Sequence, residues 1–168
     1  NDESRSLFLR LLASGPALLQ VWEEIDFVDI PGRLIPEWLA IRNRPSASAA
    51  HRYTIDRHSV EVVTRLGRET PRGNRYDDRH YQALLLAGIL HDVGKRPGVA
   101  DHAAEGARHA SMVLKRMGFD RDIIWWVTLL VREHLTLSEF ATGQNPNDPN
   151  VGDELASRLD HDPLLLDM

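Results

Sequence analysis

The spacing of apolar residues is the feature that most limits the folds open to this chain. Apolar side chains recur every three or four residues in several segments, and no segment alternates apolar and polar residues over the length of a strand. A spacing of three and four follows the 3.6-residue turn of an α-helix, whereas a half-buried strand requires a spacing of two. The sequence therefore predicts an all-α fold built from amphipathic helices.

Turn and capping residues divide this pattern into separate helices. The predicted helical ranges are 7–12, 17–25, 55–66, 80–93, 102–117, 121–134 and a helix that starts at 154. Asp101 and Asp120 are expected to cap the helices that follow them, because a carboxylate can accept hydrogen bonds from the first amides of a helix. Gly94 is expected to end a helix in the left-handed conformation, and Gly118 is expected to end the next one. The polar ranges 67–79 and 143–153 are predicted to be loops.

Length and composition indicate one globular domain and exclude several classes of function. The 168 residues carry 25 acidic and 20 basic side chains, a net charge of -5, and no cysteine. An acidic chain disfavours nucleic-acid binding, and the lack of cysteine excludes disulfides, thiolate metal sites and cysteine nucleophiles. The longest apolar run, residues 123–131, is too short for a membrane span. Because residues 1–10 also lack the features of a secretory leader, we expect a cytoplasmic protein with no membrane partner.

Three of the eight histidines fall at or next to the apolar faces of three different predicted helices. These are His58, His91 and His134. For any one of them alone, a core histidine bonded to the backbone is the simpler interpretation. A buried imidazole needs a partner, however, and helical bundles build metal sites from inward-facing side chains of several helices. Three such positions together favour one shared metal ion.

The residues that follow His91 strengthen this hypothesis. Asp92 comes next and Lys95 lies three residues further, so an imidazole, a carboxylate and an ammonium end one helix. Imidazole nitrogen with carboxylate oxygen suits a divalent ion such as Mn, Mg, Fe or Zn, and a lysine can neutralise phosphoryl charge. Asp101 and His102 form a second acid–imidazole pair, for which capping by Asp101 is an equal explanation. Motifs for a serine nucleophile, triphosphate or dinucleotide binding and zincin proteolysis are absent from the sequence.

Three sequence blocks together resemble a known family. They contain HRYTIDRHS (51–59), ILHDVGK (89–95) and LVREHLTLSE (130–139), and they keep their order and spacing from about Leu7 to the end of the chain. The blocks resemble the HD domain, a metal-dependent phosphohydrolase, of the bifunctional enzymes that attach a nucleotide to nitrogen regulatory protein PII and remove it. The resemblance implies an HD-type helical bundle with a metal site in its core. It also implies a helical lead-in over residues 1–50 and an HD domain over residues 51–168.

The resemblance also implies roles for single residues. His58, His91 and Asp92 match the ligands of a divalent metal ion. Lys95 matches a lysine that faces phosphate, and His102 and His134 match histidines that hold a second metal or contact phosphate in some HD enzymes. The signature ends in an aspartate that would lie a few residues past Met168, so we expect the HD domain to be truncated here. Gly143, Gln144 and Asn145 stand where relatives carry an Arg-Arg-Asp run.

The implied activity is hydrolysis of a nucleotidyl-tyrosine bond on PII, with a metal ion that activates water and with UMP or AMP as the group removed. The implied partners are nucleotidylated PII, a nucleotidyltransferase domain and ACT domains that sense glutamine. Two alternatives remain open from the sequence. The same metal site would serve an HD phosphohydrolase that acts on a small nucleotide, and a domain with too few ligands would be a metal-free docking or regulatory module.

Overall fold

The computed structural model describes residues 2–46, 52–69, 77–145 and 148–168, and these residues form helices and no strand. An isolated bridge joins Pro45 and Thr54. The predicted all-α class is confirmed, and no helix in the described ranges is long and apolar enough to cross a membrane. The elements are α1 (Asp2–Leu12), α2 (Ala17–Phe27), α3 (Ile30–Leu34), the 3-10 helix η1 (Pro36–Ala40), α4 (Ile55–Glu69), α5 (Asp78–Leu90), α6 (His102–Met117), α7 (Arg121–Glu133), α8 (Thr136–Gly143), α9 (Pro149–Arg158) and α10 (Pro163–Asp167).

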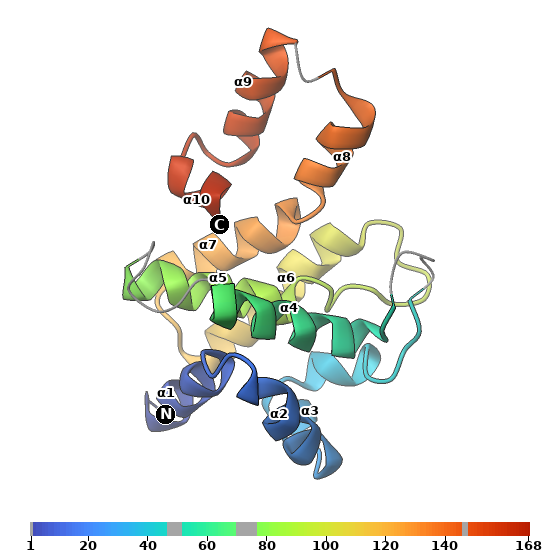
Figure 1. Cartoon of the computed structure of the whole chain (residues 1–168), viewed down its shortest axis with the longest axis vertical. Helices are drawn as coiled ribbons and strands as arrows, with labels where there is room; N and C mark the ends of the chain where they lie inside the picture. Colours follow the sequence, from blue (N-terminus) through green and yellow to red (C-terminus); the bar gives the residue numbers. More distant parts are fainter. Residues whose placement is uncertain (1, 47–51, 70–76, 146–147) are drawn as a thin grey trace.

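Helix α5 is the centre of the core (Figure 1). It packs against α4 and α7, and α6 in turn packs along α7. All residues from 83 to 90 are buried, so α5 has no solvent-facing side over this range. Helix α5 therefore departs from the amphipathic pattern that the sequence predicts for the helices in general. A helix that is apolar all round is buried on all sides, and α1, α4, α6 and α7 contact this one from different directions.

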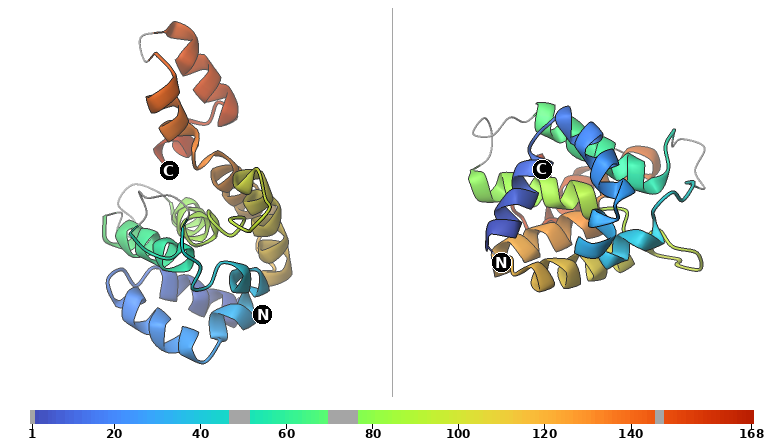
Figure 2. Two further views of the ribbon diagram at one scale, coloured as in Figure 1. Left: turned by 90° about the vertical axis from the view of Figure 1, so that its right-hand side faces the viewer. Right: turned by 90° about the horizontal axis from the view of Figure 1, so that it is seen from below.

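The N-terminal helices pack on the face of α4 and α5 that is remote from the end of α7 (Figure 2). Trp22 of α2 and Trp38 of η1 meet edge to face with ring centroids 5.3 Å apart. Arg42 binds the Asp26 carboxylate at 3.0 Å and ties the end of this segment back to α2. The aromatic pair and the ion pair hold the lead-in helices as one layer beneath α4.

The structure confirms the expected cap at the start of α6 and the expected residue at its end. For α7 it confirms where the helix begins but not the side-chain cap. Asp101 accepts a hydrogen bond from the Ala104 amide at 2.8 Å and caps α6. Gly118 ends α6 with φ +77, the left-handed conformation that glycine adopts without strain. Asp120 precedes α7, but its side chain makes no capping hydrogen bond.

Gly94 is needed for a different reason than the sequence suggested. The expected left-handed conformation is wrong, because Gly94 does not have a positive φ. A Cβ atom at Gly94 would lie 2.2 Å from the His102 carbonyl oxygen and 2.4 Å from the Gly106 amide nitrogen. Only a residue without a side chain lets the backbone after α5 approach α6 this closely. The contact brings the start of α6 next to the end of α5.

Helices α8, α9 and α10 form an arm that projects from the helical body at the end of α7 (Figures 1 and 2). The loop predicted over 143–153 is present at 144, 145 and 148, but the helix after it starts earlier than the predicted 154. Helix α8 extends to Gly143, and α9 begins at Pro149, where Asp148 accepts from the Asn150 amide at 2.9 Å. Proline is favoured in the first turn of a helix, and here it follows an aspartate cap. The loop predicted over 67–79 is wrong at both ends, because 67–69 belong to α4 and 78–79 to α5. Its residues 70–76 lie outside the described residues, as does His51.

Candidate metal centre

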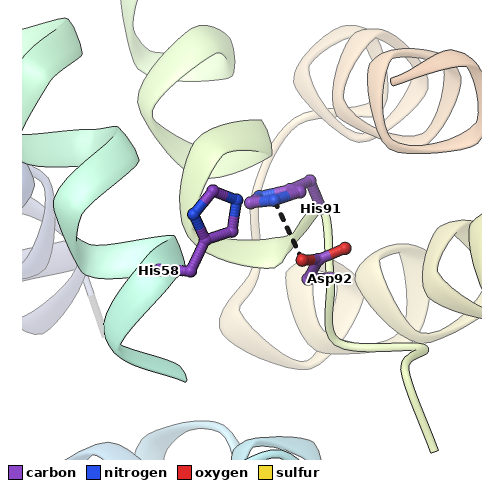
Figure 3. A group of neighbouring side chains, drawn as sticks. All are labelled: His58, His91 and Asp92. Atoms are coloured by element: carbon purple, nitrogen blue, oxygen red, sulfur yellow. Dashed lines mark ion pairs between the residues drawn. The ribbon is translucent and has the colours of Figure 1, made fainter. Parts of the chain in front are cut away.

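Side chains from four helices converge where α5 and α7 end. His58 comes from the second turn of α4, and His91 and His134 are the C-cap residues of α5 and α7. His102 begins α6. Figure 3 shows the His58 ring pointing toward His91, with Asp92 beside it. The ring centroids of His58 and His91 are 5.2 Å apart, so the structure brings the predicted residues together.

Asp92 lies at the centre of this group. Its side chain is 1% exposed. One carboxylate oxygen, Oδ2, accepts from Lys95 Nζ at 2.8 Å and lies 3.3 Å from His91 Nε2. The other, Oδ1, lies 3.6 Å from His134 Nε2 and 4.0 Å from His102 Nε2. A single buried carboxylate therefore faces three imidazoles and one ammonium.

The backbone orients two of these imidazoles. His91 Nδ1 bonds the Gly88 carbonyl at 2.9 Å, and His134 Nδ1 bonds the Val131 carbonyl at 2.7 Å. Because a carbonyl oxygen only accepts, each Nδ1 carries a proton, and in the neutral imidazole the lone pair then lies on Nε2. A metal-binding histidine is fixed by this kind of second hydrogen bond. The backbone bond expected of a core histidine is thus present, but it leaves Nε2 facing Asp92.

The ligand atoms form two overlapping groups of three. His58, His91 and Asp92 make one group, and Asp92, His102 and His134 make the other. Within each group the ligand atoms all lie within 4.8 Å of one another. Metal–nitrogen and metal–oxygen bonds are about 2.0 to 2.6 Å long, so ligand atoms no farther apart than 4.8 Å could share one ion. Asp92 belongs to both groups.

Unpartnered polar atoms support the fit of a cation. Asp92 Oδ1, His102 Nε2 and His134 Nε2 are buried and have no hydrogen-bond partner in the described residues. A buried acceptor without a partner is costly, and native proteins rarely leave several of them in one place. A divalent ion between these atoms would give each of them a partner. The donor set therefore suits a divalent metal ion.

The charge states of the cluster also favour a cation. Burial alone would raise the pKa of Asp92, but the imidazoles of His134 and His91 and the ammonium of Lys95 outweigh burial and hold its pKa far below the usual range. Burial and then the charge of Lys95 lower the pKa of His102. The carboxylate is therefore ionised and the His102 imidazole neutral near pH 7. These are the protonation states that metal binding requires.

A cavity of about 410 Å³ opens beside the cluster, and we name it the aliphatic pocket. Its polar end contains side chains of the cluster, and most of its remaining wall is leucine. The arm closes one side of this cavity through Leu159 of α9 and Leu165 of α10. The polar lining side chains are His58, His91, Asp92, Lys95, Glu133, His134 and Thr136.

Sequence reasoning missed Glu133 and Thr136. Thr136 Oγ1 donates to Glu133 Oε2 at 2.7 Å, and both side chains line the aliphatic pocket. Arg158 of α9 lies 3.7 Å from the same Glu133 oxygen, so the pair also contacts the arm. The signal available was the position of Glu133 directly before His134 in the REH block. His80 and His109, which the sequence left without a role, bond Asp77 and Glu105 instead of the cluster.

Comparison with known proteins agrees with this geometry. The HD domain family matches residues 55–162, which include all five histidine and aspartate residues of the cluster. Proteins named bifunctional uridylyltransferase/uridylyl-removing enzyme are similar to most of the chain. The one from Streptomyces coelicolor is 40% identical over 88% of this chain and 17% of its own length. The one from Mycobacterium tuberculosis is 36% identical over 99% of this chain and 20% of its own length.

A third relative of the same name, from Caulobacter vibrioides, is 32% identical over 86% of this chain and 16% of its own length. The chain thus spans about a fifth or less of these relatives. No solved structure matches it. The family match covers well over half of the chain and coincides with the helices that supply the cluster. The chain belongs to the HD domain family.

Proposed function

We propose that this domain is a metal-dependent phosphodiesterase that removes a nucleotidyl group, UMP or AMP, from a tyrosine of nitrogen regulatory protein PII. The observation that carries the proposal is the convergence of three imidazoles on the buried Asp92 carboxylate. Two further findings support it. The chain is an HD domain, and its relatives are named as uridylyl-removing enzymes.

In this proposal His58, His91 and Asp92 hold a divalent ion, whose identity among Mn, Mg, Fe and Zn stays open. A bound ion there would supply Lewis acidity, which lowers the pKa of water and offsets phosphoryl charge. The backbone carbonyls behind His91 and His134 keep each Nε2 directed inward. The low pKa of Asp92 keeps this ligand charged over the whole neutral range.

Lys95, His102 and His134 serve the phosphoryl group in this proposal. The Lys95 ammonium now pairs with Asp92 Oδ2, and in this proposal it also contacts a phosphoryl oxygen. Water attacks phosphorus, the bond between phosphorus and the tyrosine oxygen breaks, and this oxygen keeps the electron pair and takes up a proton that the water loses. Phenol has a pKa of about 10, so departure needs little help from a strong acid. The products are the nucleoside monophosphate and unmodified tyrosine.

The test is release of UMP from uridylylated PII by the purified chain with added Mn²⁺, Mg²⁺ or Zn²⁺. We expect metal-dependent release from the wild-type chain and none from His91→Gln or Asp92→Asn. His80→Gln is the matched control, because this histidine pairs with Asp77 outside the cluster. Hydrolysis of free nucleotides but not of modified PII would move the assignment to a small-nucleotide HD phosphohydrolase. Failure to bind metal would identify a docking or regulatory module.

We further propose that the domain acts in the cytoplasm beside a nucleotidyltransferase domain and glutamine-sensing ACT domains. The names of the relatives support the first of these partners, because each combines uridylyl transfer with uridylyl removal. A direct check is to join the chain to such a transferase domain and measure whether glutamine changes the rate of UMP release.

A further inference from the structure

Two cavities of opposite character border the candidate metal centre. The aliphatic pocket lies on the side of His58 and His134. A second cavity of about 380 Å³, which we name the polar cleft, lies on the side of His102. Glu133, Leu135 and Thr136 line both, so the two cavities share one wall where α7 gives way to α8. A substrate with two unlike halves joined at phosphorus would fit one half into each.

The hydrogen-bonding side chains of the aliphatic pocket come from the cluster with Lys95 and from Glu133 and Thr136. The rest of its described wall is apolar, and it comes from α4, α5, α7 and the arm: Val62, Leu66, Leu84, Leu130, Leu159 and Leu165 are its main members. Leu159 and Leu165 are 6% and 2% exposed, so these two leucines of the arm face this space, whereas Leu137 and Leu166 of the same wall are 58% and 46% exposed. Burial of an apolar ring in such a space is favourable by about 25 cal/mol per Å².

This wall discriminates between the two halves of a nucleotidyl-tyrosine. A uracil or adenine base carries carbonyl, N–H or amino groups, and each would lose its water without gaining a partner among leucines. The only polar group on the phenyl ring of the tyrosine ester is the ester oxygen, which stays bound to phosphorus. The pocket therefore accepts the aryl half and penalises the nucleoside half.

The polar cleft has the opposite composition. Charged groups in its wall come from the N-cap of α6, from α7 and from the arm: Asp101, Arg132, Glu133, Glu139 and Arg158. Carboxylates accept hydrogen bonds from ribose hydroxyls, and arginines donate to base carbonyls. Arg158 is already held by Thr136 at 3.4 Å and lies 3.6 Å from Glu139, so the guanidinium is positioned before a ligand arrives.

We propose that the aliphatic pocket binds the aryl group of the phosphodiester and that the polar cleft binds the nucleoside, with phosphorus at the metal centre between them. The proposal rests on the proposed function and deepens it by assigning the direction in which the substrate lies. It makes the domain selective for aryl esters of nucleotides. The arm lines both cavities, so in this proposal it contacts both the aryl group and the nucleoside of the substrate.

Two probe substrates with one leaving group test the assignment by kinetics. Uridine 5′-(4-nitrophenyl phosphate) has both halves, and methyl 4-nitrophenyl phosphate has only the aryl half. Leu66→Asn places an amide in the aliphatic pocket with little change of volume, and we expect it to raise KM for both probes by about tenfold. Arg132→Gln should raise KM by a similar factor for the uridine probe alone. Leu39→Asn is the control, because Leu39 is 53% exposed and lines neither cavity.

The reverse pattern, in which Leu66→Asn affects only the uridine probe, would overturn the assignment. A second readout does not depend on turnover. In methyl and amide NMR spectra of the Mg²⁺-loaded chain, phenylphosphonate should shift the signals of Val62, Leu66 and Leu159, whereas uridine should shift those near Arg132. Phenylphosphonate that leaves these methyl signals unmoved would refute the aryl pocket. If it shifts them but neither probe is hydrolysed, the proposed function fails and the pocket assignment survives.

Discussion

His91 and His134 occupy the same position on two different helices and are held there by the same hydrogen bond. Each is the C-cap residue of its helix, and each donates from Nδ1 to the carbonyl three residues upstream, at 2.9 and 2.7 Å. Their ring centroids lie 5.3 Å apart. Each helix end thus supplies a carbonyl that fixes one tautomer, and the two Nε2 atoms both lie within 3.6 Å of the Asp92 carboxylate.

Asp92→Asn is expected to weaken metal binding by at least about 100-fold, because this carboxylate belongs to both groups of candidate ligands and carries their only negative charge. Competition with a chromophoric chelator measures the affinity. His80→Gln should bind as the wild-type chain does. Unchanged affinity in Asp92→Asn would contradict the proposed site.

His134→Gln is expected to separate metal binding from turnover. His58, His91 and Asp92 form a group without His134, so the variant should keep its tightest-binding ion while the hydrolysis rate falls by about 100-fold. His91→Gln should lose both. Metal content after gel filtration, measured beside the rate of 4-nitrophenol release, distinguishes the two variants. Equal loss of metal in both would show that one ion depends on all the histidines.

Lys95→Met is expected to leave metal affinity undiminished while lowering the rate. The ammonium occupies Asp92 Oδ2 at 2.8 Å, so it competes with an incoming cation for that oxygen. Its removal frees the ligand but deprives the phosphoryl group of a positive partner, which costs about 100-fold in rate. Titration with Mn²⁺ measures the metal affinity, and a rate measurement on the same sample measures the loss of hydrolysis. A fall in metal affinity would mean that Lys95 supports the site instead of the substrate.

Gly94→Ala is expected to lower the free energy of unfolding by about 3 kcal/mol, because the new Cβ would overlap backbone atoms that cannot move aside. Those atoms are the His102 carbonyl and the Gly106 amide. Urea denaturation measures the change. Gly143→Ala is the matched control, since nothing lies within 4 Å of a Cβ at that position. Equal stability of the two variants would refute the close approach of α6 to the end of α5.

Stability is expected to fall as the pH drops below about 6.5. Burial, followed by the charges of Arg96 and Arg108, lowers the pKa of the 8%-exposed His109 from its ordinary 6.5. Below pH 6.5 His109 is therefore protonated in the unfolded chain but stays neutral in the folded chain. The contribution of neutral His109 to the free energy of unfolding is complete above pH 6.5 and is lost as the pH falls below that value. His102 adds to the same loss.

Urea titrations at pH 7.5 and 5.5, with a chelator present, measure this dependence. His109→Gln should show a smaller loss of unfolding free energy between the two pH values and should retain the part due to His102. The same loss in the variant and the wild-type chain would show that His109 does not carry the effect.

Much of the helical structure can be predicted from the sequence, because it depends on interactions between residues close together in the chain. A spacing of three and four sets the α-helical period, and capping by Asp101 and termination at Gly118 depend only on residues within the next turn. The HD motif likewise places His91, Asp92 and Lys95 together, since these residues share one helix end. The sequence also marked His58 and His134 as inward-facing, from the periodicity of their own helices.

What the sequence left open depends on contacts between distant segments. The role of Gly94 came from the approach of α6, and Leu159 and Leu165 became pocket walls only because the arm turns back toward α4 and α5. The sequence did not predict that α9 starts at Pro149, because the asparagines and proline at this start are equally common in turns. By itself the sequence determined the helical class and the residues able to bind a metal, since propensity and donor chemistry are properties of single residues. Only the tertiary structure decided that four helix segments meet at Asp92, because the distance between side chains depends on how whole helices pack.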